Sequence, residues 1–148
     1  SPGLSSAAER AARKASDDAL AARIEREGIV AFVAFWESLS LWKSQENLPA
    51  AARLSLHEKR LQNDPNGLAE SLRQMGTGVQ PSLWEQLGEL AMPVLLLAGA
   101  EDEKFVAIAR QMVGAIPRAW PLIVPGAGHT IHLEQPEHFR QEVVGFVE

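Results

Sequence analysis

Two polar residues, Asp102 and His129, have the setting of an acid and a base that share one site. Asp102 ends the segment Gly99-Ala-Glu-Asp, and His129 ends the segment Pro125-Gly-Ala-Gly-His. Each segment follows a short apolar run that we expect to be a buried strand, and α/β folds place their sites beyond the carboxyl ends of such strands. A histidine can take a proton from a serine or a water near neutral pH, and a carboxylate can fix its tautomer and stabilise its charged form. We therefore predict that His129 is a catalytic base and that Asp102 orients it.

The nucleophile is the missing member of this group. An acid that precedes the base in the chain fits the last two members of a triad in the order Ser, Asp, His. The turn Gly-x-Ser-x-Gly that would carry the serine does not occur in the 148 residues. We interpret the chain as the carboxy-terminal half of a catalytic domain and as a truncated product, with the nucleophile in residues before Ser1, and we expect it to be inactive by itself.

Some neighbouring residues allow other interpretations. Asp102 alone could cap the helix that follows it, because Asp is a frequent N-cap, but its combination with Gly-x-Gly-His favours the catalytic role. Glu101 and Glu103 are expected to be solvated surface charges. His132 and Glu134 are of the residue types that bind metals, but we expect no metal site, because their spacing falls in a loop without further ligands.

The composition is that of an ordinary globular chain, with 46% hydrophobic and 22% charged residues. A net charge of -5 without a Lys/Arg cluster argues against nucleic acid and against anionic membrane surfaces as partners. A small molecule or a protein is the expected partner. The absence of cysteine fits a reducing cytoplasm, and no apolar run approaches the roughly 20 residues that a membrane span needs.

Residues 1–90 are expected to form a mainly helical lid or cap. Ser6-Ala-Ala-Glu9 has the spacing of a capping box and opens an Ala-rich helix that stops at Gly28. Apolar residues at three- and four-residue steps predict a second helix from Ile29 that is broken by Leu48-Pro49. Further helices are expected up to about residue 62, over about 68–75, and as a short turn from residue 81.

Residues 91–148 are expected to form a parallel α/β unit. The apolar runs 94–97 and 122–124 predict two strands, and helices over 104–116 and from Pro136 alternate with them. Two strands alone cannot make a sheet that is buried on both faces, and their edges would be unpaired. Missing amino-terminal strands, a second copy of the chain, or an exchange between copies could cover those edges, and the sequence does not choose among them.

The helical part also holds tryptophans and arginines that could face a ligand. Trp36, Trp42 and Trp84 are most simply core or lid-packing residues. Arg13 and Arg60 are, by residue type, more often surface charges than anion clamps. An anionic substrate under a cap would nevertheless need fixed guanidinium groups.

Six segments together resemble one enzyme family. The chain is similar over essentially all its residues to the 2-succinyl-6-hydroxy-2,4-cyclohexadiene-1-carboxylate synthases of menaquinone biosynthesis, which have the α/β-hydrolase fold. The Gly-x-x-Asp and Gly-His pieces mark only the superfamily, and the lid segments narrow the resemblance to this family. The segments are Ser1-Pro-Gly-Leu4, Phe35-Trp-Glu37, Met75-Gly-Thr-Gly78, Pro81-Ser-Leu-Trp84, Gly99-Ala-Glu-Asp-Glu-Lys-Phe105 and Pro125-Gly-Ala-Gly-His-Thr-Ile-His-Leu-Glu134.

The resemblance implies the carboxy-terminal part of an α/β-hydrolase fold preceded by a helical lid, and a lyase without a cofactor. A serine deprotonated by the histidine would remove a proton from a succinyl-cyclohexene precursor, and pyruvate would be eliminated. The family's acid and base match Asp102 and His129. The positions that would hold the substrate's carboxylates match Arg13, Arg60 and Trp36, with Arg10 as the alternative to Arg13.

Two other functions stay open at the level of the sequence. The same triad could serve an esterase or a carbon-carbon hydrolase that acts on an acyl substrate. The chain could also be a non-catalytic association module that keeps the fold without a nucleophile.

Overall fold

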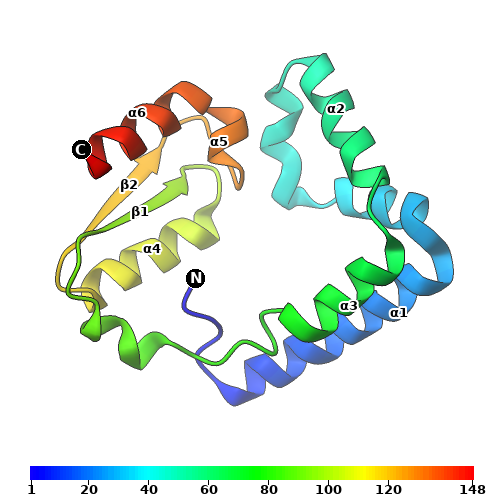
Figure 1. Ribbon diagram of the computed structural model, residues 1–148, viewed down its shortest axis with the longest axis horizontal. Helices are drawn as coiled ribbons and strands as arrows, with labels where there is room; N and C mark the ends of the chain where they lie inside the picture. The colour runs from blue at the N-terminus through cyan, green and yellow to red at the C-terminus, as the bar shows by residue number, and fades with distance from the viewer. The chain divides into compact units, whose positions relative to one another are not determined.

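The computed structural model describes residues 1–148, which divide into two compact units (Figure 1). One unit comprises residues 1–38 and 54–85, and the other comprises residues 39–53 and 86–148. The segment 39–53, which the sequence assigned to the helical part, therefore belongs to the unit that carries the strands. The division into a lid over residues 1–90 and an α/β unit over residues 91–148 stays a prediction.

The first unit is built on a long interrupted helix, α1 (Ala7–Glu37). Ser6 and Glu9 form the predicted capping box, in which the Ser6 hydroxyl accepts from the Glu9 N–H and the Glu9 carboxylate accepts from the Ser6 N–H, both at 3.1 Å. Gly28 interrupts the helix with a φ of 78° and a ψ of 178°, which a residue with a side chain rarely adopts. The predicted stop at Gly28 is confirmed as a kink within one element.

Two further helices belong to this part of the chain, α2 (Ala50–Leu61) and α3 (Pro65–Met75). α3 begins with a proline after Asp64, whose carboxylate accepts from the Gly67 N–H at 2.6 Å. It packs against α1, where small and branched side chains are buried, and Arg73 of α3 forms a salt bridge with Glu25 of α1. The short turn expected from residue 81 is a 3-10 helix, η2 (Trp84–Glu89).

The second unit contains a parallel pair of strands, β1 (Val94–Gly99) and β2 (Ala119–Val124). α4 (Glu103–Ala115) connects them and packs on both, and a short α5 (Ile131–Glu134) and α6 (Pro136–Val147) follow β2. Separate apolar clusters lie against α4 and against α5 and α6, so helices cover both faces of the pair (Figure 1). The predicted order of strand, helix, strand and helix is confirmed.

Three local features differ from the expectation. β2 begins at residue 119, three residues before the predicted start (122 minus 119), and includes Pro121. Residues 40–47, expected to continue a helix from Ile29, form a separate 3-10 helix, η1 (Ser40–Asn47). His132, expected in a loop, lies in α5, because the turn after Thr130 closes with backbone hydrogen bonds from Leu133 and Glu134 to the Thr130 carbonyl.

The strands of the pair are only partly covered in this chain. Most residues of β1 are half-buried, and Trp120 of β2 is 50% exposed. None of the helices in the structure combines the length and the apolar character that crossing a membrane requires.

Candidate active site

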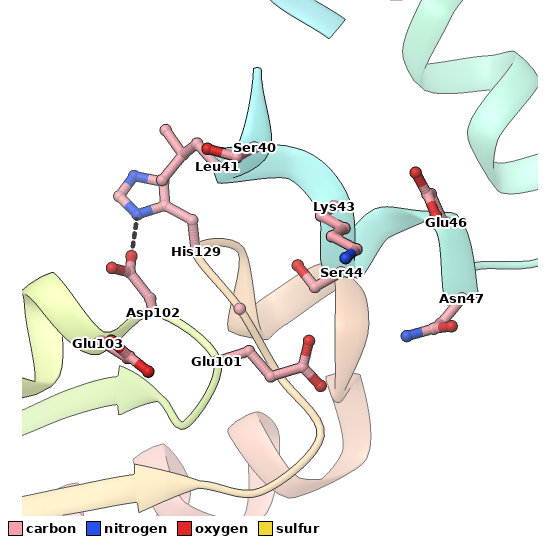
Figure 2. A pocket seen from close by; sticks show the side chains of 11 residues that line it. Ser40, Leu41, Lys43, Ser44, Glu46, Asn47, Glu101, Asp102, Glu103 and His129 are labelled. Atoms are coloured by element: carbon pink, nitrogen blue, oxygen red, sulfur yellow. Dashed lines mark hydrogen bonds and ion pairs between the residues drawn. The ribbon is translucent and has the colours of Figure 1, made fainter. Parts of the chain in front are cut away.

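Asp102 and His129 meet at the carboxyl ends of β1 and β2 (Figure 2). The Nδ1 atom of His129 lies 2.6 Å from Oδ2 of Asp102, and the exposed fractions of the two side chains are 30% and 6%. The other oxygen of Asp102, Oδ1, accepts from the Phe105 N–H at 3.1 Å and caps α4. The two interpretations of Asp102 are therefore compatible, because each role uses a different oxygen.

The loops that present this pair are held together by their backbones. Ala100 donates to the Val124 carbonyl and Glu101 donates to the Ala127 carbonyl, both at 2.9 Å. A side chain at Gly99 would overlap the Ala127 carbonyl, and Gly126 has a φ of 66°. This close approach brings the Asp102 loop within reach of the imidazole.

The hydrogen bond fixes the chemistry of the imidazole. An ionised carboxylate only accepts, so Nδ1 of His129 donates to Asp102, and in the neutral imidazole Nε2 then keeps the lone pair that can take a proton. Two aromatic rings meet the imidazole edge to face and restrict its orientation: Trp42 at 5.5 Å and Phe105 at 4.9 Å between ring centroids. The arrangement is that of a general base with an oriented ring.

A cavity of about 570 Å³ opens beside the pair. Its wall mixes opposite charges, because Lys43 of η1 faces the same space as several carboxylates (Figure 2). Glu101 and Glu103 are exposed, as predicted, and they also line this cavity. Ser40, Glu46 and Asn47 complete the polar wall.

Trp36 and Arg60 line a second cavity, of about 260 Å³, within the helical unit. Trp36 stacks on Phe32 with 5.6 Å between ring centroids, and Arg60 Nη1 donates to Glu37 at 2.8 Å. Burial raises the pKa of Glu37, but the hydrogen bonds from Arg60 and His57 outweigh it and hold that pKa below its ordinary value. The Arg60 guanidinium is thus already oriented by a carboxylate.

Arg13 lies outside the wall of that second cavity. Its Nε donates to the buried Asp17 at 2.8 Å, one helical turn along α1. Arg10, its alternative, donates to the carbonyls of Leu4 and Ser5. Trp36 and Arg60 therefore line the same cavity, whereas Arg13 forms a separate ion pair with Asp17.

The sequence did not single out the residues that surround the histidine loop. Trp42, expected to be a core or lid-packing residue, packs on His129 itself. Ser44 and Gln45, both buried, come from η1 and contact this loop from far along the chain. No local pattern signals such contacts, because they depend on the fold of residues 39–53.

Gly128 lies too close to Ser44 to accept a side chain without a shift of the loop. A methyl group at residue 128 would overlap the hydroxyl of Ser44, so Gly128→Ala should lower the free energy of unfolding by about 1–3 kcal/mol. Urea unfolding followed by circular dichroism measures the change. Gly114→Ala in α4 is the matched control, because nothing lies within 4 Å of the added group and helix propensity should leave that variant equally or more stable. Equal stability of both variants would contradict the close contact at Ser44.

No protein-family model matches the sequence. Individual relatives do. A protein from Serratia proteamaculans named 2-succinyl-6-hydroxy-2,4-cyclohexadiene-1-carboxylate synthase is 37% identical over 146 residues, which cover 99% of this chain and 54% of the relative. A Bacillus subtilis protein provisionally given the same name is 46% identical over 146 residues, with 99% and 53% coverage.

Solved structures agree with these relatives. MenH from S. aureus superposes with a TM-score of 0.97 at 40% identity, covering 99% of this chain and 55% of its own. An esterase from Thermogutta terrifontis reaches a TM-score of 0.72 at 25% identity, with 91% and 49% coverage. The chain spans about half the length of the proteins that it matches. The chain therefore has the fold of the carboxy-terminal part of an α/β-hydrolase, and it is similar over 99% of its length to the 2-succinyl-6-hydroxy-2,4-cyclohexadiene-1-carboxylate synthases.

Proposed function

We propose that the protein containing this chain is a lyase that eliminates pyruvate from a succinyl-cyclohexene carboxylate precursor in menaquinone biosynthesis. The observation that carries the proposal is the bond between His129 and Asp102, in a chain 46% identical over 99% of its length to a relative with that synthase's name. A serine from a part of the protein outside this chain completes the triad. No cofactor takes part, because proton removal and elimination need only a base and stabilisation of the developing charge.

In this reaction the residues of the chain handle one proton. Nε2 of His129 takes the proton of the serine hydroxyl, and the serine oxygen then removes a proton from the precursor. Asp102 stabilises the imidazolium that forms, because its Oδ2 already holds the Nδ1 proton. The electron pair left on the precursor then breaks its bond to the leaving group, which departs as the enolate of pyruvate. The proton on Nε2 passes to this enolate, so that the serine and the imidazole both return to their neutral forms and no acyl-enzyme forms.

The partner in this proposal is a small anionic substrate. Trp36, Arg60 and Arg13 bind its carboxylates, and the pairing of Arg60 with Glu37 supports a guanidinium held in a fixed orientation beside Trp36. The edges of β1 and β2 are covered either by amino-terminal strands of the same domain or by a second copy of the chain. The cytoplasmic location expected from the sequence is part of the same proposal.

Arg60→Ala in the whole protein is expected to raise KM for the precursor about tenfold or more and to change kcat little. A charge-assisted hydrogen bond to a carboxylate contributes about 1.5–3 kcal/mol, which the alanine removes from substrate binding. Arg53→Ala, on the exposed side of the same helix, is the matched control and should keep the wild-type KM. An unchanged KM in Arg60→Ala would remove this residue from the substrate site.

A comparison of two substrate classes tests the proposed reaction against its alternative. The likeness to the Thermogutta esterase favours ester hydrolysis as the second candidate. The whole protein is supplied with the precursor, to follow pyruvate, and with short-chain nitrophenyl esters, to follow nitrophenol. The proposal expects rapid pyruvate release and slow ester cleavage. The reverse result would assign an esterase, and the absence of both activities would favour a non-catalytic module.

A further inference from the structure

The carboxylate of Glu134 binds the backbone on both sides of His129. It accepts from the Gly128 N–H at 2.5 Å and from the Thr130 N–H at 3.1 Å, and the Thr130 hydroxyl donates to it at 2.6 Å. Gly128 and Thr130 are the two chain neighbours of His129. One side chain therefore fixes the peptide groups before and after the histidine.

A second layer of side chains from η1 supports this carboxylate. Ser44 hydrogen-bonds to Glu134, and Gln45 Nε2 donates to the Thr130 hydroxyl at 3.0 Å. The hydroxyl of Thr130 thus accepts from Gln45 and donates its one hydrogen to Glu134. Ser44 and Gln45 are 8% and 6% exposed, so water competes little for these bonds.

The ionised form of Glu134 is the one that these contacts require. Burial raises its pKa, but the hydrogen bonds from Thr130, Gly128 and Ser44 outweigh burial and hold the pKa below its ordinary value. A charged acceptor with four donors around it is a stiff anchor, because charge-assisted hydrogen bonds are stronger than neutral ones.

We propose that Glu134 is a positioning residue for His129, holding the backbone on both sides of it so that the imidazole stays on Asp102. The proposal rests on the proposed function only where it names His129 as the base. A residue that merely terminates α5 would support the helix, and its replacement would leave the imidazole on Asp102. A positioning residue has a further effect, on the His129 hydrogen bond itself.

The test is Glu134→Gln with the protein labelled with ¹⁵N at its histidines. The amide of glutamine keeps the size of the side chain, but it has one acceptor oxygen in place of two and lacks the charge. The expected result is loss or strong exchange broadening of the His129 Nδ1 proton resonance. The ¹⁵N signals of His57 and His138 should stay in place, and circular dichroism should report an unchanged helix content. A His129 resonance that keeps its position and width would overturn the proposal.

Two further sets of variants keep the test decisive. Glu137→Gln is the matched control, because that carboxylate is 76% exposed and pairs with Arg140 on α6, and it should leave the His129 signal intact. If Glu134→Gln does not fold, Thr130→Val and Thr130→Ser replace it. Valine removes the hydroxyl that serine keeps, so the signal should weaken in Thr130→Val and recover in Thr130→Ser. Equal signals in both would contradict the proposal.

The outcome is separable from that of the proposed function, because the readout needs no substrate. If the protein releases no pyruvate but Glu134→Gln still changes the His129 signal, the proposed reaction is contradicted and the positioning role of Glu134 is retained. If the protein is active, Glu134→Gln should lower kcat about tenfold to a hundredfold at nearly constant KM, because a base displaced by about 1 Å slows the chemical step.

Discussion

His129→Ala in the whole protein is expected to lower kcat for pyruvate release by several orders of magnitude, roughly 10³-fold or more. The alanine removes the imidazole that takes the serine's proton and passes it on, and what remains is the stabilisation from the rest of the site. The fold should survive, because the imidazole is partly exposed and contributes little to either apolar cluster. Steady-state pyruvate release and thermal unfolding measure the two effects.

A second histidine provides the control for this variant. His138 lies on α6 at a similar exposure of 38% and contacts Glu142. His138→Ala should retain the kcat of the wild type. Wild-type turnover in His129→Ala would contradict the assignment of the base, whatever the stability of the protein.

Asp102→Asn should separate the two roles of this residue. Asparagine caps helices about as well as aspartate, so the bond from the Phe105 N–H and the free energy of unfolding should be nearly retained. The same change removes the charge that stabilises the imidazolium and allows the wrong tautomer of His129, so kcat should fall by about 10³- to 10⁴-fold. Kinetics and urea unfolding of the same sample give both quantities.

Asp64→Asn is the matched control for the capping role. Asp64 caps α3 through the Gly67 N–H and lines neither of the two cavities described above. It should lose as little stability as Asp102→Asn and should keep its kcat. If Asp102→Asn were as active as Asp64→Asn, Asp102 would be a helix cap and nothing more.

The pair itself could be predicted from the sequence because its signals are local. Apolar runs mark the two strands, and the polar residue after each must emerge at the same edge of a parallel sheet. The capping box at Ser6 and the break at Gly28 are of the same kind, since each depends on a few neighbouring residues. The structure confirms these elements.

The surroundings of the pair could not be predicted because they depend on contacts between distant segments. η1 reaches the histidine loop through Gln45 and Thr130, which are 85 residues apart in the chain. The ring of Trp42 contacts His129 only because of that packing. The carboxylate of Glu134 binds Gly128 and Thr130 within six residues of the chain, and Gln45 of η1 adds support through the Thr130 hydroxyl. The pairing of Arg13 with Asp17 is, by contrast, a local contact one helical turn along α1.

The two compact units do not follow the change in composition along the chain. Composition changes near residue 90, where the strands begin, and this change suggested a single boundary. Compactness follows contacts, however, and places residues 39–53 with the strands. Composition does not record contacts between segments that are far apart in the chain.

The most direct test of the account is the rate at which the whole protein releases pyruvate from the precursor and from its analogue deuterated at the carbon that loses the proton. We predict enzymatic pyruvate release that is slower from the deuterated substrate, because His129 acts through a serine that breaks this carbon-hydrogen bond. Pyruvate release no faster than in buffer, or an enzymatic rate that is insensitive both to deuterium and to His129→Ala, would contradict it.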